Sequence, residues 1–348
     1  SKKRAMLLSL LSKLVHTSLS RLSKKLNWKL MLLVMELITT IQSHIEIPLE
    51  SDVLLTLVKF VDGSHPEISK KGMFWIASIM DTVQSRAFSK YDIGDLLSLK
   101  PSDPTIGPLK DILPDNCSQS FFHEIRNIEN PLFFIDTKEW IPTSPWNKEL
   151  EVVKPYESSS FGYNDSDERS IKQFASKINK KWLQMLLQTH IDESEVTCAF
   201  FPGIVYFFSS ITSLIISGYV EDFTLADLFE ITDKIYKGDE RSTHVVLGEV
   251  FSGILFACKT NHVAMKFADK EIANRLKSIF DNDLSQSTYK MWSIFSWWLS
   301  SHFDMRRTPE ILDLICDFEV DKNVKRSPFG LICRLSFLKS YLGSEMNR

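Results

Sequence analysis

The sequence predicts an all-α protein, a HEAT-like or armadillo-type α-solenoid with one proline-rich, partly extended insert. Three observations support this prediction. Apolar residues recur at helical spacing along most of the chain. Three predicted helices, beginning near residues 241, 286 and 324, follow one another at about 38–45 residues, the period of HEAT and armadillo repeats. Eight of the 13 prolines fall between residues 89 and 169, where they prevent long helices.

The length and composition agree with a repeat protein. A chain of 348 residues exceeds what one hydrophobic core usually holds, but in a solenoid each repeat needs only its neighbours. The net charge of −3 argues against a generally basic nucleic-acid-binding protein, although it does not exclude a local basic patch. We therefore divide the chain into helical repeats at 1–88, an irregular insert at 89–169 and HEAT-like repeats at 170–348.

Cysteine usage predicts a reducing compartment, the nucleus or the cytoplasm. The five cysteines are widely spaced and form neither a CxxC pair nor a cluster with zinc-ligand spacing. Cys258, Cys316 and Cys333 lie in apolar helical patterns, where a cysteine acts as a small core residue.

The first segment contains a proline at a helix start and a basic cluster. Pro66 follows a short turn and suits the first helical position, since its φ is already helical. The predicted helices of this segment are Lys3–Ser23, Asn27–Ser43, Ser51–Val61 and Pro66–Val83. The possible anion-binding patch consists of Lys2, Lys3, Arg4, Lys24 and Lys25. A solvated helix face is the favoured explanation for this charge, and a site for an acidic surface or a phosphorylated small molecule is the alternative.

The insert has little helical character. Leu132–Asp136 and Leu150–Lys154 are candidate short strands, and Glu157–Glu168 is a candidate mobile loop. Trp140 and Trp146 would give this segment apolar surface to bury against the helices.

Helices resume near residue 170. The predicted ranges are Ser170–Thr189, Ser194–Ser217, Leu225–Tyr236, Ser242–Lys259, Ala264–Phe280, Ser285–Phe303, Pro309–Phe318 and Val324–Leu342. The uncharged stretch Phe200–Val220 has about the length of a transmembrane helix. Because it contains Pro202, Gly203 and several hydroxyl residues and has acidic flanks, we interpret it as a buried core helix.

The stretch Gly238–Lys259 shows the predicted design most clearly. Ser242 is the expected N-cap, since its hydroxyl can accept a bond from an amide of the first turn. A broad apolar stripe follows, with Gly248, Glu249 and Ser252 on the opposite side. We expect Gly253 to let a neighbouring helix come close, so the stretch has a packing role.

Motifs for catalysis are missing from the sequence, which predicts a protein that is not an enzyme. It contains no glycine-rich phosphate loop, no GxSxG elbow and no HExxH pair. Asp281-Asn282-Asp283 resembles the start of a calcium loop but lacks the later Gly and Glu, so a turn between helices is favoured. Trp292, Trp297 and Trp298 could line a peptide groove, but core packing with one exposed ring is the favoured interpretation.

The chain resembles the large single-chain HEAT-repeat proteasome activators, the bleomycin-sensitivity family. The resemblance extends over roughly Ile128–Phe318 and depends on the order of four short motifs, none of which is specific alone. They are Pro131–Trp140 (PLFFIDTKEW, with a following Pro145-Trp146 whose order departs from the family), Asp239–Leu255, Ser287-Thr288-Tyr289 with Trp292, and Pro309–Phe318.

The resemblance implies a non-catalytic scaffold that caps the α-ring of the proteasome core particle and promotes gate opening and peptide entry. It implies core-particle α subunits and further repeats of the same chain as partners, without direct nucleic-acid or membrane binding. It also implies nuclear and cytoplasmic localisation and a link to protein degradation and DNA repair. No cofactor is expected, although family members bind inositol phosphates through Lys/Arg pockets. The family's C-terminal Tyr-Tyr-Ala-type tail does not occur at the end of this chain, and we interpret the chain as an internal wall segment.

One alternative stays open at this point. Another HEAT-repeat adaptor, such as a nuclear-transport receptor, would bind a peptide or a small GTPase on its concave face. Nucleotide-sensitive cargo binding would distinguish that function from proteasome activation.

Overall fold

The computed structural model describes most of the helical part of the chain. The described residues are 53–62, 66–88, 165–197, 199–238, 240–259, 261–303, 305–318 and 327–346, with Thr17, Lys29, Leu33 and Glu36 as single helical positions. Most of the two predicted N-terminal helices, most of the insert and both candidate strands therefore lie outside the described residues.

The described chain is an all-α solenoid, and no strand occurs in the ranges given above. The first group of helices is α3 (Val53–Val61), α4 (Pro66–Phe88) and α8 (Asp165–Ala175). The main stack consists of α9 (Lys180–Thr197), α10 (Pro202–Ile216), α11 (Leu225–Ile235), α12 (Arg241–Cys258), α13 (His262–Ser278), α14 (Tyr289–His302), α15 (Pro309–Cys316) and α16 (Pro328–Met346).

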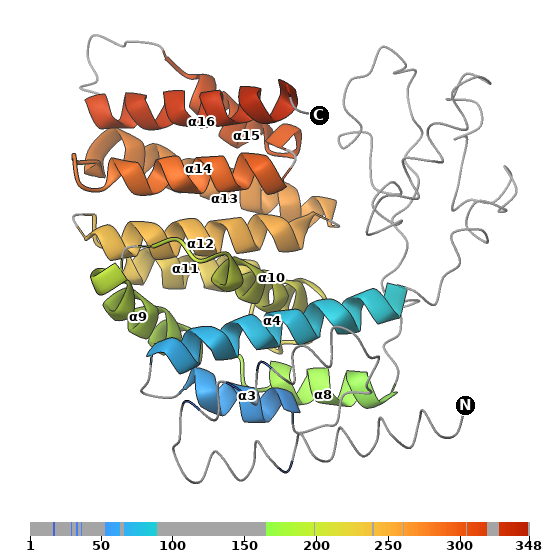
Figure 1. The fold of residues 1–348 in the computed structure, drawn as a ribbon. Helices are drawn as coiled ribbons and strands as arrows, with labels where there is room; N and C mark the ends of the chain where they lie inside the picture. Colours follow the sequence, from blue (N-terminus) through green and yellow to red (C-terminus); the bar gives the residue numbers. More distant parts are fainter. Residues whose placement is uncertain are drawn as a thin grey trace, which may run out of the picture.

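The helices of the stack form two layers (Figure 1). Layer A contains α9, α11, α13 and α15. Layer B contains α10, α12, α14 and α16, and α4 extends it by packing on α10. In Figure 1, α12, α14 and α16 lie one above another, with α11, α13 and α15 behind them. Each layer A helix and the layer B helix that follows it make one repeat.

The layer B helices recur at the spacing of a helical repeat. They begin at Pro202, Arg241, Tyr289 and Pro328, so successive starts are 39, 48 and 39 residues apart. This result agrees with the repeat predicted from residues 241, 286 and 324.

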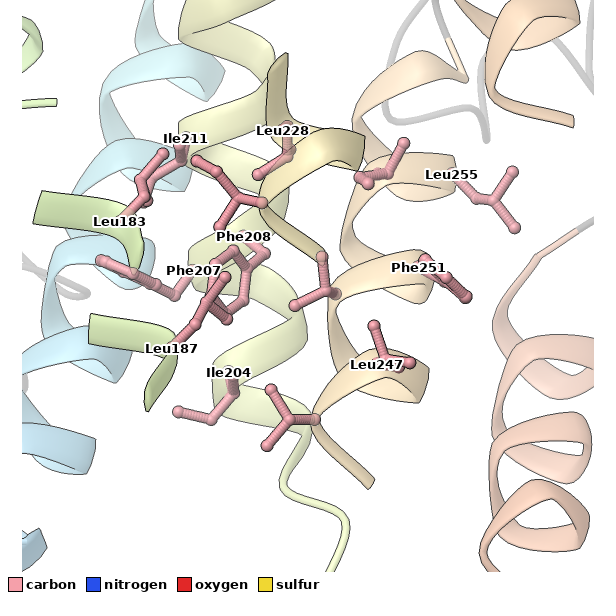
Figure 2. Packing of buried hydrophobic residues seen from close by; sticks show 14 of the residues in the cluster. Leu183, Leu187, Ile204, Phe207, Phe208, Ile211, Leu228, Leu247, Phe251 and Leu255 are labelled. Carbon is pink, nitrogen blue, oxygen red and sulfur yellow. The ribbon is translucent and has the colours of Figure 1, made fainter. Parts of the chain in front are cut away.

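One continuous hydrophobic core runs through the stack. Figure 2 shows its centre, where Leu187 of α9, Phe207 and Phe208 of α10, Leu228 of α11 and Phe251 of α12 come together. All five side chains are buried. The core thus joins successive repeats, as expected for a solenoid in which no repeat buries its apolar face alone.

Several predicted helix boundaries were wrong, and two of the predicted helices differ most from the structure. The predicted helix Ser170–Thr189 is two helices, because the Asn179 side chain accepts a hydrogen bond from the Trp182 amide at 3.0 Å and starts α9 afresh. The predicted helix Ser194–Ser217 begins only at Pro202, while α9 continues to Thr197. Pro202 has no N–H to donate and restricts the residue before it, so a helix begins there and does not pass through it.

The edges of the insert are also helical. α4 runs to Phe88, five residues past its predicted end, and α8 begins at Asp165, inside the range assigned to the insert. The acidic residues Asp165–Glu168, expected in a mobile loop, form the first turn of α8. Acidic side chains in the first turn favour a helix through its N-terminal partial positive charge.

Side chains also join neighbouring layer A helices. The Arg275 guanidinium of α13 donates to both carboxylate oxygens of Asp233 on α11, at 2.7 and 2.6 Å. Asp269 of α13 accepts bonds from the amides of Glu310 and Ile311 at 2.9 and 3.1 Å and so caps the start of α15. These contacts fix the rotation of each repeat against the next.

The uncharged stretch Phe200–Val220, which has about the length of a transmembrane helix, contains α10. Most of its apolar residues are buried in the core, as predicted. In the described part of the chain, no helix combines the length and the apolar character needed to cross a membrane.

Candidate functional site: the aromatic surface of layer B

Aromatic rings from three helices meet on the outer side of layer B. Trp298 of α14 lies 5.7 Å from Phe200, 6.2 Å from Tyr206 and 5.7 Å from Phe256 of α12, measured between ring centroids. Tyr206 also meets Phe256 edge-on at 5.9 Å. Rings from α14 and from α10 and its N-terminal flank thus contact each other across α12. We call Phe200, Phe201, Tyr206, Phe256, Trp297 and Trp298 the aromatic surface.

The rings from α10 and α14 explain an unexpected property of α12. The sequence places Gly248, Glu249 and Ser252 on the side of α12 opposite its apolar stripe, and in the structure all three are buried as well. They are buried because α12 has neighbours on every side: α10 and α14 within its own layer, and α9, α11 and α13 of layer A. The aromatic surface covers its remaining face.

The surface continues to α4 through two further rings. A Cβ atom at Gly203 would lie 2.8 Å from the Phe201 ring and 3.1 Å from the Phe74 ring, so both rings pack over this glycine. Phe74 and Phe201 are each more than one-third exposed, and Trp297 on α14 is 60% exposed. Exposed apolar side chains that are contiguous usually mark a contact site.

A buried hydrogen bond between a histidine and a glutamate holds one edge of the aromatic surface. Oε2 of Glu249 lies 2.6 Å from Nε2 of His190 on α9, and both side chains are at most 2% exposed. The other carboxylate oxygen accepts a hydrogen bond from the backbone amide of Phe201 at 2.6 Å. Glu249 therefore ties α9 and the start of α10 to α12 and fixes the backbone that carries Phe200 and Phe201.

A second buried histidine fixes α14 against α12. The indole N–H of Trp292 donates to Nδ1 of His244 at 2.9 Å, and Nε2 of His244 lies 2.9 Å from the carbonyl oxygen of Gly238. Because a carbonyl oxygen can only accept, Nε2 carries the proton and His244 is the neutral tautomer that accepts at Nδ1. Both histidines thus act in packing, by means of polar bonds inside an apolar core.

The three tryptophans of α14 divide as the favoured interpretation predicted. Trp292 and Trp298 are buried in the described structure, and Trp297 is the exposed ring. The cysteine prediction was right for Cys258 and Cys333, which are buried, and burial raises the pKa of both thiols, in Cys333 to about 12. It was wrong for Cys316, which is exposed because it ends α15 on the side away from the core.

Two of the three structural residues predicted from the sequence lie at close contacts or helix starts. α4 begins at Pro66. A Cβ atom at Gly253 would lie 2.7 Å from Cβ of Phe208 and 2.8 Å from the carbonyl oxygen of Val205, so α10 and α12 approach closely there. The basic residues Lys2, Lys3, Arg4, Lys24 and Lys25 lie outside the described residues, and the anion patch stays a prediction.

The assignment of Ser242 as the N-cap of α12 was wrong. The helix begins at Arg241, and the residue before it, Glu240, makes no side-chain cap. The hydroxyl of Thr243 donates instead to the carbonyl oxygens of Lys237 and Glu240, at 2.7 and 2.8 Å, and closes the preceding turn. Ser242 is therefore inside the first helical turn, buried and without a hydrogen-bond partner among the described residues.

Sequence reasoning did not predict the buried polar residues of the site. His190 and Glu249 are 59 positions apart, and His244 and Trp292 are 48 apart. The only sequence signal for these buried polar residues was the charged residue Glu249 within the broad apolar run of α12. The carboxylate of Asp281 accepts a hydrogen bond from the buried Arg334 guanidinium at 2.7 Å, and Asp281 lies in a π-helical segment, Ile279–Asp283, that follows α13 and was expected to be a turn.

The described site offers contact surface and no evident chemistry. Within the residues that the structure describes, no three His, Cys, Asp or Glu side chains are placed to hold a metal ion. Aromatic rings next to lysines, as with the Lys259 ammonium 5.0 Å from the Phe256 ring centroid, can bind another chain by apolar and electrostatic contact.

The sequence has a clear relative among known proteins. No protein-family model matches it. The chain is 25% identical over 312 residues, 88% of its length, to the proteasome activator BLM10 of Saccharomyces cerevisiae. It spans 14% of the length of that relative. Over most of its length the chain is thus similar in sequence to a proteasome activator, and its all-α solenoid fold agrees with that similarity.

Proposed function

We propose that the chain is a scaffold segment of a HEAT-repeat proteasome activator. In this role it contributes part of a curved helical wall that caps the α-ring of the proteasome core particle, and the complete protein promotes gate opening and peptide entry. It acts by shape and contact, without catalytic chemistry of its own.

A single observation carries the proposal, the similarity to BLM10 along 88% of the chain. A match of this extent includes the repeat helices and both sides of the insert, so it is a similarity of architecture as well as of short motifs. The described structure agrees with a scaffold, since its buried histidines and carboxylates bond to neighbouring helices.

The proposed partners follow from the same similarity. They are the α subunits of the core particle and further helical repeats of the same polypeptide. We propose the nucleus and cytoplasm as the location and protein degradation and DNA repair as the processes, with inositol phosphates as ligands of Lys2, Lys3, Arg4, Lys24 and Lys25.

Copurification and peptide hydrolysis test this function. The full-length protein is added to closed core particles, and hydrolysis of a short fluorogenic peptide is followed. We expect the protein to copurify with the core particle and to raise the hydrolysis rate severalfold. Core particles with a permanently open gate are the control, because an effect that acts through the gate should not raise their rate further.

Two outcomes would contradict the proposal. If the protein neither copurifies with core particles nor raises hydrolysis, it is not an activator. If it instead releases a bound cargo protein on addition of nucleotide and a small GTPase, it is an adaptor of the nuclear-transport type.

A further inference from the structure

The outer side of layer B combines apolar side chains with lysines in a repeated arrangement. On α4, Lys70 and Lys71 lie one helical turn before the exposed Phe74. On α14, Lys290 lies one turn before Ile294, and Trp297 follows at the next position of the same face. α16 repeats this arrangement with Leu335, Lys339 and Leu342.

The charge on these helices is mostly of one sign. The basic residues with described, solvent-accessible side chains in layer B and α4 are Lys70, Lys71, Arg241, Lys290 and Lys339, with Lys259 directly after α12. Among the described, solvent-accessible side chains of layer B and α4, only that of Asp81 is acidic. Glu36, outside them, is paired with Lys71 at 3.4 Å. The surface is thus complementary to an acidic partner that also carries apolar side chains.

The aromatic surface is also held rigidly. Glu249 fixes the Phe201 backbone through a buried carboxylate, and Trp298 is stacked on His302 at 4.6 Å between centroids while meeting three other rings. A surface whose side chains are already ordered loses less conformational entropy when a partner binds. Rigid aromatic side chains are the usual anchors of protein contacts.

An acidic peptide fits this surface better than a nucleic acid. Base stacking needs exposed ring faces. Here Phe200, Tyr206, Phe256 and Trp298 pack against one another at ring distances of 5.7–6.2 Å, and Trp298 is also stacked on His302. Only Trp297 presents most of its ring to solvent. The available contacts are therefore ring edges and aliphatic stems, which suit apolar side chains.

We propose that the outer side of layer B binds an extended, acidic peptide segment of another protein, with apolar side chains on the aromatic surface and carboxylates at the lysines. Neighbouring helices pack about 8–10 Å apart, and an extended chain advances about 3.3 Å per residue. About three residues therefore span one helix, and a segment of about 12 residues crosses layer B. This binding function does not depend on the proteasome role.

A fluorescence-anisotropy titration of the full-length protein tests this proposal. The probe is a fluorescein-labelled peptide of 12 residues with Leu or Phe at every third position, Asp or Glu elsewhere and one central Pro. We expect saturable binding that weakens with salt. Trp297→Ser and Ile294→Ser should each lower the affinity by about fivefold or more, because they remove exposed apolar anchors. Lys290→Glu should lower it by about threefold at low salt, with a smaller effect at high salt.

Layer A supplies matched controls for the substitutions. Val263→Ser removes an apolar side chain that is 78% exposed on α13, and Lys270→Glu reverses an exposed charge on the same helix. Neither should change peptide affinity. Trp297, Val263 and both lysines are exposed, and the side chain of Ile294 is 42% exposed. Thermal melts of each variant verify that the fold is kept.

Four results would overturn the proposal. The first is that the acidic probe shows no saturable binding to the wild-type protein, and the second is that a probe with Lys in place of Asp and Glu binds equally well. The third is that Val263→Ser and Trp297→Ser lose the same amount of affinity for the acidic probe. The fourth is that a 12-nucleotide oligothymidylate binds more tightly than the acidic probe. The last result would identify a nucleic-acid surface. Because no core particle is present, a negative result leaves the activator proposal untouched, and a failed hydrolysis assay leaves this one untouched.

Discussion

At the scale of single residues, the described structure depends on a few buried polar groups that connect distant helices. Asp269 is the clearest example, since its carboxylate caps α15 from α13 while being 2% exposed. Burial raises the pKa of Asp269 to about 6, and the negative charges of Glu310 and Asp313 add to this effect, whereas the two amide bonds oppose it. Desolvation disfavours the charged form even when hydrogen bonds are present.

The pKa of Asp269 predicts a pH dependence of stability. Because the pKa is higher in the folded than in the unfolded chain, this residue stabilises the fold most below pH 3.8 and loses that effect as the pH rises through about 6. Asp269→Asn keeps an acceptor for the amides but cannot titrate. Between pH 7.5 and 4.5, the free energy of unfolding of the wild type should rise relative to this variant by roughly 1–2 kcal/mol. Urea unfolding at several pH values measures this difference, and parallel pH profiles would contradict it.

At the scale of helices, glycines decide how closely layer B helices approach. A side chain at Gly253 would meet backbone atoms of α10 at 2.8 and 3.0 Å, whereas one at Gly248 would meet the Phe295 side chain at an ordinary 3.4 Å. The sequence indicated Gly253 as a packing residue, but it could not distinguish Gly253 from Gly248, because the difference depends on which face of α12 meets backbone. The sequence also missed Gly330, where a Cβ would clash with the carbonyl oxygen of Phe280.

Alanine at the two glycines of α12 should therefore have opposite effects. Gly253→Ala should destabilise the protein by roughly 1–3 kcal/mol, since α10 must shift to admit the methyl group. Gly253→Leu should destabilise it at least as much. Gly248→Ala is the matched control and should be neutral or stabilising by up to about 1 kcal/mol, because it only reduces the freedom of the unfolded chain. Thermal or urea unfolding measures both, and equal effects would show that α10 and α12 are not in close contact at Gly253.

At the scale of the whole molecule, the continuous core makes each repeat depend on its neighbour. Phe337 of α16 covers Phe280 and Phe295, which are at most 1% exposed. Asp269 and Asp281 would also lose the partners that α15 and α16 provide. The stack is therefore stable through its interfaces more than through its individual helices.

Removal of the last repeat should weaken the remaining stack. A chain ending before residue 305 should melt at a lower temperature and aggregate, because it exposes the apolar side of α14. A chain lacking only residues 344–348 is the control and should melt like the full chain. An unchanged melting temperature and a monodisperse state for the shorter chain would show that α15 and α16 are not part of one cooperative unit.

The sequence by itself determined the fold class, the repeat period and most helices, because helical spacing of apolar residues and helix-starting prolines such as Pro66 and Pro309 are local signals. The resemblance to the proteasome activators was also readable from the sequence, since motif order does not depend on folding. Only the tertiary structure decided that Glu249 is buried, that Ser242 is not a cap and that rings from α10 and α14 meet across α12. The burial of Glu249 and the meeting of the rings arise from contacts between residues 48 to 98 positions apart, whose energies depend on helix packing that no local pattern records.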